Sequence, residues 1–467
     1  MERLHVFTDD ALGRSDATDL AERLARREVS QEEVTEAAIE RLQRAAPLQA
    51  MVLDTFDAAR QRARSGSASG AFAGVPTLIK DNIDVQGLPT RQGSAAVGAK
   101  PLKQTSELAQ QYLAQGFNLL GKSTLPAFGF TATTETAHQP ATRNPWSLAH
   151  SSGGSSGGSA ALVAAGAVPI AHANDGGGSI RIPAACCGLV GLKSTRGRLV
   201  VQEAARALPI NIVSDGVVTR SVRDTARFFA AAELHYRNPA LPPIGNVTGP
   251  GQRRLRIGVM TDSLIKPTTC PDTLRALEQT SVLLADLGHQ VEPARIALPG
   301  RFVDDFLLYW GMLAFSIQTL GPLLMRQGFE RRQLDLLTKG LSRHFGRNFW
   351  KAPGMLRQLK KSSDQYAQSL ADYDVVLTPV LAHTTVEIGY LAADLPFEIQ
   401  MERLLEYITF TPANNASGAP AIALPLAETS TGLPLGLQFC GRHGDERTLL
   451  ELAFELEAAQ PFRLLAD

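Results

Sequence analysis

The sequence predicts an α/β protein in which helices cover both faces of one large sheet. The C-terminal half alternates short apolar runs with amphipathic runs, and two glycine-rich segments, 151–159 and 175–179, have apolar flanks. Strands that alternate with helices are typical of a sheet covered on both faces. A flexible linker would lack apolar flanks, so we interpret the glycines as sharp turns between buried elements.

The N-terminal part predicts helices. Ser30 and Glu33 have the spacing of a capping box, and Val34, Ala38 and Leu42 then fall on one helical face. We therefore expect residues 1–70 to form a helical segment that packs on a catalytic domain formed by residues 71–467, in one compact unit overall. The remaining elements are expected in the following order: strands at 74–80, 117–120, 170–174, 255–260, 374–377, 421–426 and 435–441, and helices at 106–115, 160–167, 272–287 and 448–459.

Composition narrows the class of function. The 467 residues include 46 basic and 46 acidic side chains, a balance that argues against nucleic acid as the main partner. The nine histidines and four cysteines show no HExxH, CxxC or other metal-ligand spacing, so we expect no metal and no cofactor. Residues 1–10 lack the apolar run of a signal peptide, and 160–173 is too short to cross a bilayer. A cytoplasmic protein with no membrane partner is therefore expected.

Two short motifs offer competing functions. Residues 116–123 match the phosphate-binding pattern GxxxxGK[ST], but a helix precedes them and the intervening residues are strand-like, which argues against a phosphate cradle. Residues 153–157 match GxSxG, which would make Ser155 the nucleophile of an esterase or of another histidine-based serine hydrolase. That elbow needs a strand leading into it, whereas 145–152 looks like a loop. The esterase interpretation stays open as an alternative.

A third arrangement suits amide hydrolysis. An activated hydroxyl can attack an amide if a base accepts its proton, and a buried lysine serves when desolvation lowers its pKa toward neutrality. Lys80 ends an apolar strand, and Gly176, Gly177 and Gly178 precede Ser179. Backbone amides of such a glycine run can stabilise a developing oxyanion. A lone lysine at a strand end is more often a surface residue, so these residues alone do not show that the groups meet.

A longer pattern resembles a known family. Residues 153–161, 175–184 and 188–198, together with 74–82 and 411–421, are similar to the amidase signature. The resemblance implies a single α/β/α domain around a large twisted mixed sheet. It also implies a Ser–Ser–Lys triad with Lys80 as base, Ser155 as bridging serine after a cis peptide bond, and Ser179 as nucleophile. Gly176, Gly177 and Gly178 would form the oxyanion hole, a small amide would be the partner, and a homodimer is compatible with the family.

Within that family the sequence favours one branch. Residues 141–146, 172–175 and 194–198 look like the 6-aminohexanoate cyclic-dimer hydrolases, whereas 199–204 lacks the serine-rich stretch of amidotransferase A-type subunits. A further alternative is a catalytically inactive binding or scaffold subunit with the same fold. Such relatives commonly lose the lysine or one of the serines, and all three residues are present here. Asn174, Ser194 and Ala127 depart from the family pattern, and none of the three is expected to touch the triad.

Two segments are candidates for substrate binding. Residues 306–312 are rich in aromatic side chains, which suits either an amphipathic core helix or the wall of a pocket. We expect Tyr309 or Trp310 to line an apolar acyl pocket. Phe128 and Thr131 are the second pair of candidates, from their place near the signature in the family.

Overall fold

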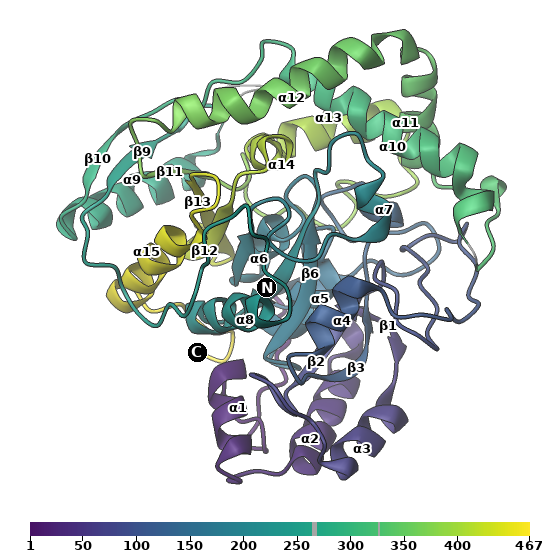
Figure 1. Cartoon of the computed structure of the whole chain (residues 1–467), viewed down its shortest axis with the longest axis vertical. Coiled ribbons are helices and arrows are strands. Elements are labelled where there is room, and N and C mark those ends of the chain that lie inside the picture. Colours follow the sequence, from purple (N-terminus) through teal and green to yellow (C-terminus); the bar gives the residue numbers. More distant parts are fainter. Residues whose placement is uncertain (264–268, 326) are drawn as a thin grey trace.

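The computed structural model describes residues 1–263, 269–325 and 327–467, and its largest sheet has eight strands in the order β10-β9-β11-β13-β12-β7-β8-β6 (Figure 1). Strands β9, β10 and β11 are mutually parallel, and each later neighbour is antiparallel, so the sheet is mixed. The strands are β6 (Ile170–Asp175), β7 (Val190–Lys193), β8 (Ser214–Thr219), β9 (Arg256–Val259), β10 (Gln290–Pro293), β11 (Val375–Pro379), β12 (Ala421–Glu428) and β13 (Pro434–Gly441).

Helices cover this sheet on both sides, which confirms the predicted α/β class. Helices α5 and α6 pack on one face, and α8, α9 and α15 pack on the other. The strands and helices expected between residues 70 and 194 and after residue 254 are all present, with ends shifted by a few residues. The covering helices are α5 (Gly157–Ala164), α6 (Arg181–Cys187), α8 (Val222–His235), α9 (Pro271–Asp286) and α15 (Glu446–Ala459).

The N-terminal segment carries the expected helices and one strand that was not expected. Ser30 caps α2 (Gln31–Arg44) in a complete capping box with Glu33. Strand β1 (Met51–Asp54) pairs with β3 (Asn118–Ser123), a contact that a four-residue run does not reveal in the sequence. The largest hydrophobic cluster extends from Val6 to Leu456, so this segment shares the main core. The other helices of the first half are α1 (Ala17–Ala25), α3 (Phe56–Ser65), α4 (Glu107–Leu113) and α7 (Glu203–Arg206).

A second, three-stranded sheet of order β1-β3-β2 lies against the β6 edge of the main sheet. Strand β2 (Pro76–Lys80) is buried throughout, and the Thr77 hydroxyl donates to the Ile170 carbonyl of β6 at 2.9 Å. The GxxxxGK[ST] letters lie largely on β3, where Lys122 is fully buried and donates to Asp81 Oδ1 at 3.1 Å. A buried strand cannot wrap a phosphate, which confirms the expectation for that motif.

The helices of residues 302–417 lie together at one end of the molecule, opposite α1, α2 and α3 (Figure 1). They are α10 (Phe302–Leu324), α11 (Leu336–Gly346), α12 (Ala352–Ser369), α13 (Phe397–Tyr407) and α14 (Pro412–Ser417). By length and composition α10 could cross a membrane, and the expectation drawn from 160–173 did not cover this helix. In this fold α10 packs against α11 and α12.

Candidate active site

Lys80 stands at the end of β2, where this strand runs beside β6. Its Nζ lies 2.7 Å from Ser155 Oγ, 2.9 Å from Ser156 Oγ and 2.7 Å from Asn174 Oδ1. The lysine is fully buried, and Ser155 is 2% exposed. The structure therefore brings together two of the predicted triad residues, which are 75 positions apart in the sequence. The Gly154–Ser155 peptide bond is cis.

The surroundings of Lys80 favour its neutral form. Burial lowers the pKa of Lys80 to about 7, although the negative charges of Asp215 and Asp175 act in the opposite direction. A buried ammonium loses its hydration, and distant carboxylates compensate for only part of that loss. Near neutral pH this lysine can therefore accept a proton, which an exposed lysine cannot do.

Asn174 corrects an expectation from the sequence. Asn174, Ser194 and Ala127 depart from the family pattern, and none of them was expected to touch the triad. The side-chain Oδ1 of Asn174 nevertheless accepts a hydrogen bond from Lys80. Ser194 instead offers its backbone carbonyl to Lys193, and Ala127 begins a short 3-10 turn. Asn174 stands next to the glycine run in the sequence, but only the packing of β2 beside β6 shows that its side chain reaches Lys80.

Ser179 lies in the turn between β6 and α6, beside the two preceding serines. The Ser156 backbone N–H donates to the Ser179 carbonyl at 3.3 Å, which joins this turn to the start of α5. Ser179 is 7% exposed, and it lines a cavity together with Gly154 and Gly177. A hydroxyl in this position is reachable from the cavity while its backbone is held by the protein.

A buried ion pair holds the glycine turn in place. Asp175 accepts hydrogen bonds from the Gly178 N–H at 2.7 Å and from Arg181 Nε at 2.9 Å. Burial by itself would raise the pKa of Asp175. The positive charge of Arg181 and the hydrogen bonds that the Asp175 carboxylate accepts instead hold this pKa well below its usual range. The turn is also tied from outside, because the Thr411 hydroxyl donates to the Gly177 carbonyl at 2.6 Å. The sequence analysis did not single out Asp175, Arg181 or Thr411, although all three lie in the segments that it quoted.

The three glycines of the turn differ in how much room they have. A Cβ on Gly178 would lie 2.5 Å from Thr411 Oγ1, and its φ of +130° is one that other residues rarely adopt. A Cβ on Gly177 would meet the Trp310 ring at 2.9 Å. A Cβ on Gly176 would have Val213 Cγ2 as its nearest contact, at 3.6 Å. Only the Gly176 position has space for a side chain.

Gly178→Ala is therefore expected to lower kcat/KM by about 100-fold or more, the usual cost of removing an oxyanion donor. The Gly178 N–H itself donates to Asp175, but the added methyl group would clash with Thr411 and displace the turn, and with it the amides of the neighbouring residues. Gly176→Ala serves as the matched variant and is expected to cause a much smaller loss. Steady-state kinetics of both, at equal folded concentration by circular dichroism, check this prediction. Equal losses in the two variants would contradict it.

The cavity beside Ser179 is mostly apolar, and the space within it and its open mouth amounts to about 570 Å³. Of the four predicted pocket residues, Thr131 and Trp310 line it, and Phe128 and Tyr309 are absent from its lining. Tyr309 faces the core, where its hydroxyl hydrogen-bonds the backbone of Ile210. Other apolar residues in the lining are Phe130, Ile182, Val303, Phe306, Leu307, Met401, Leu404, Leu405 and Ile408.

The segment before the GxSxG letters also differs from the expectation. Residues 145–152 were expected to form a loop, but β5 (Ser147–Ser151) is a strand. It pairs with β4 (Arg143–Asn144) in a separate two-stranded ladder, so it is not the strand of the main sheet that a nucleophile elbow requires. Within the ranges that the structure describes, no group of three His, Cys, Asp or Glu side chains is placed to hold a metal ion.

Comparison with known proteins gives a consistent result. The Amidase family model matches residues 33–450. The Mycobacterium leprae protein named "Putative amidase AmiC" is 49% identical over 99% of this chain and 98% of its own length. The 6-aminohexanoate-cyclic-dimer hydrolase of Paenarthrobacter ureafaciens is 34% identical over 96% of this chain and 95% of its own length. A solved structure of a 6-aminohexanoate cyclic dimer hydrolase with its substrate superposes with a TM-score of 0.84 at 30% identity, covering 96% of this chain and 97% of the other.

Proposed function

The chain belongs to the amidase family and is a hydrolase of carbon–nitrogen bonds, and we propose that it cleaves small carboxamides or N-substituted amides through a serine acyl-enzyme. Ser179 is the nucleophile, Ser155 relays protons and Lys80 is the base. The observation that carries this proposal is the buried contact of Lys80 Nζ with Ser155 Oγ at 2.7 Å.

The hydrogen bonds around Lys80 single out Ser155 as the relay. A neutral amine has two N–H donors and one lone pair. The side-chain Oδ1 of Asn174 accepts a hydrogen bond from one of these N–H groups, and Ser156 Oγ accepts one from the other. Ser156 can act as an acceptor here because its hydroxyl proton is donated to the backbone carbonyl of Asn174, at 3.2 Å. The lone pair is then left for the hydroxyl proton of Ser155. This arrangement favours Ser155 over Ser156 as the group that passes a proton to the base.

The reaction proceeds in two stages. Ser179 Oγ attacks the amide carbon and gives its proton to Ser155, while the proton of Ser155 passes to Lys80. The oxyanion is stabilised by the backbone amides of the turn at Gly176, Gly177 and Ser179, whereas the Gly178 N–H, which the sequence also offered for this role, already donates to Asp175. The carbon–nitrogen bond then breaks, and the proton on Lys80 returns through Ser155 to the leaving nitrogen. Water attacks the acyl-enzyme by the same relay and releases the carboxylic acid and the free serine.

Active-site labelling tests the proposed function. A fluorophosphonate is expected to modify Ser179 in the wild type, and peptide mass spectrometry locates the adduct. Labelling is expected to disappear in Ser179→Ala and to slow strongly in Lys80→Ala. An adduct on Ser155, or a rate that is indifferent to Lys80, would favour the esterase alternative and overturn the proposed mechanism.

The pH profile should report the titration of Lys80. Because its pKa is lowered to about 7, the neutral form predominates above this pH and the ammonium below it. For an uncharged amide substrate, kcat/KM is expected to be constant at higher pH and to fall tenfold per unit below about pH 7. Initial rates between pH 5 and 9 measure this limb. A limb near pH 10, where an ordinary lysine titrates, would contradict a buried neutral base.

Trp310 is expected to contribute binding energy for the acyl group. Its ring lies 5.8 Å from that of Phe130 and 5.5 Å from that of Phe306, between ring centroids. Trp310→Ala should lower kcat/KM about tenfold for hexanamide, through KM, and less for acetamide, because apolar contact area is lost. Tyr309→Phe is the control, since Tyr309 faces the core. Unchanged kinetics in Trp310→Ala would remove this residue from the pocket.

A further inference from the structure

A strongly basic segment lies at the end of the molecule that contains α11 and α12. This basic segment, residues 331–361, includes nine lysines or arginines and one carboxylate, so its formal charge is +8. The flanking carboxylates of Glu330 and Asp364 reduce the excess only to +6. The 46 basic and 46 acidic side chains of the whole chain cancel, so the total composition conceals this local excess.

The basic residues of α11 share one side of the helix. Lys339, Arg343 and Arg347 follow one another at intervals of four positions, which places them in one row on a helical surface. Arg343 and Arg347 are exposed, whereas Leu337 and Leu341 are buried on the opposite side of the helix. The positive charges of α11 therefore face away from the core.

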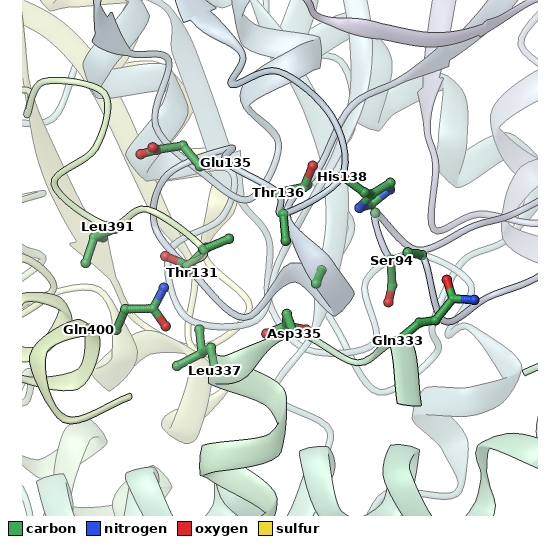
Figure 2. Close-up of a pocket in the computed structure, with 15 residues that line it drawn as sticks. Ser94, Thr131, Glu135, Thr136, His138, Gln333, Asp335, Leu337, Leu391 and Gln400 are labelled. Carbon is green, nitrogen blue, oxygen red and sulfur yellow. The ribbon is translucent and has the colours of Figure 1, made fainter. Parts of the chain in front are cut away.

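The carboxylate of the basic segment does not neutralise this row. Asp335 lines a second pocket (Figure 2), which borders the cavity at Ser179 through a shared lining residue. Its oxygens accept from the N–H and the hydroxyl of Thr338, at 2.8 and 2.6 Å. Within the part of the chain that the structure describes, no basic side chain of the segment forms an ion pair. Exposed arginines elsewhere do so, such as Arg253 with Asp374 at 2.8 Å.

Large apolar side chains are exposed beside these charges. Among the described residues, seven of the thirteen exposed large hydrophobic side chains lie between residues 315 and 350. Phe349 and Trp350 are 61% and 63% exposed, and in the chain they stand between Arg347 and Lys351. Exposed aromatic rings with basic neighbours are typical of an interaction surface.

The end of α10 adjoins the basic segment. Arg331 donates to the backbone carbonyl of Thr319, in the last turns of α10, at 2.7 Å. Leu320 follows Thr319 directly, and Leu323 lies one helical turn further on, with 80% of its surface exposed. Exposed leucines and unpaired basic residues therefore occur at the same end of the molecule.

We propose that this end of the molecule binds the surface of a bilayer that contains anionic lipids, with Phe349 and Trp350 at the level of the headgroups. Anionic headgroups neutralise the unpaired lysines and arginines, each of which adds to the attraction. Tryptophan and phenylalanine are typical of the boundary between headgroups and acyl chains. This inference departs from the expectation of no membrane partner, because that expectation used the total charge and residues 160–173.

Two other occupants fit these observations less well. A second copy of this chain across a two-fold axis would place the same basic side chains opposite one another, and like charges repel. A nucleic acid would neutralise the charge through its phosphates, but it offers no apolar medium for Leu320 and Leu323.

Vesicle binding tests the proposal on the wild-type protein. We expect at least tenfold tighter binding to vesicles of equal parts phosphatidylcholine and phosphatidylglycerol than to vesicles of phosphatidylcholine alone. High salt should remove this preference, because it screens exposed charges. Equal binding to both kinds of vesicle, or binding to duplex DNA without binding to the mixed vesicles, would overturn the proposal.

Charge reversal identifies the surface responsible. The double variant Arg343→Glu/Arg347→Glu is expected to bind the mixed vesicles at least tenfold more weakly and to hydrolyse a water-soluble amide normally. Arg26→Glu/Arg64→Glu is the matched control, because it makes the same change of charge on exposed residues at the opposite end of the molecule (Figure 1). Unchanged binding in the first variant, or an equal loss in the control, would contradict the assignment.

Tryptophan fluorescence tests the insertion of the aromatic pair. Of the three tryptophans, Trp350 is exposed, Trp146 is buried and Trp310 is partly buried. Mixed vesicles are expected to shift the emission of the wild type to shorter wavelength, and Trp350→Phe should bind the vesicles but lose the shift. Binding without a shift in the wild type, or a shift that survives in Trp350→Phe, would overturn the insertion. None of these binding measurements requires turnover, so they do not depend on the proposed mechanism.

Discussion

Lys80→Met is expected to abolish amide hydrolysis, lowering kcat by a factor on the order of 10⁴ or more, as for other residues that act as one catalytic unit. Methionine fills much the same space but cannot accept the proton that Ser155 passes on. Ser155, Ser156 and Asn174 lose their common partner, so we also expect a modest fall in the free energy of unfolding. Single-turnover kinetics and urea denaturation of the same preparation measure both effects.

Lys193→Met is the matched control. Burial and the nearby Arg181 charge lower the pKa of Lys193 to about 7, as burial does for Lys80, but its Nζ donates to the backbone carbonyls of Ser194 and Ala419. This variant is expected to lose stability while its folded fraction remains active. If both variants lost activity in proportion to stability alone, Lys80 would be a structural residue and not the base.

Arg181→Met is expected to lower the free energy of unfolding by about 3–5 kcal/mol, the usual cost of leaving one member of a buried ion pair alone. The guanidinium is fully buried. Its partners are Asp175 at 2.9 and 3.1 Å, Asn415 at 2.7 Å, Gln438 at 2.9 Å, the Thr411 carbonyl at 3.0 Å and Asn414 at 3.3 Å. Without it Asp175 is buried and unpaired, and the glycine turn loses its anchor. Urea denaturation measures the stability of the variant.

Arg198→Met separates the local effect from the global one. Arg198 and Glu446 form a second buried pair, and they lie at 1% and 0% side-chain exposure. We expect a comparable loss of stability from this variant but normal fluorophosphonate labelling of Ser179 in its folded fraction. Arg181→Met should label slowly even where it is folded. Equal labelling rates would show that Arg181 supports the fold without shaping the site.

Local patterns predicted those elements whose causes are local. The capping box at Ser30 and Glu33 depends on residues three positions apart, and the strand β2 was predicted from a short, mostly apolar run. Strands β1, β4, β5, β7, β8 and β10 were not predicted, and β1 and β5 are short strands that form by pairing with other segments. The triad assignment came from the family resemblance, and it stays a prediction until the labelling experiment is done.

The candidate pocket residues also show which features could be predicted from the sequence and which required the structure. The sequence marked residues 306–312 as an aromatic run, but it could not tell which side of the helix faces the cavity. The structure places Trp310 at the cavity and turns Tyr309 to the core, although the two are neighbours.

Residues close together in the chain were enough to predict the α/β class, part of the order of the elements and the glycine turn, and the longer sequence pattern pointed to the family. The assembled fold was needed to show that Lys80 meets Ser155, Ser156 and Asn174, that Arg181 holds the turn from β6 to α6, and that a second pocket borders the cavity. Secondary structure follows largely from neighbours along the chain. Burial, pKa shifts and hydrogen-bond partners depend instead on which distant strands and helices lie side by side, here β2 against β6.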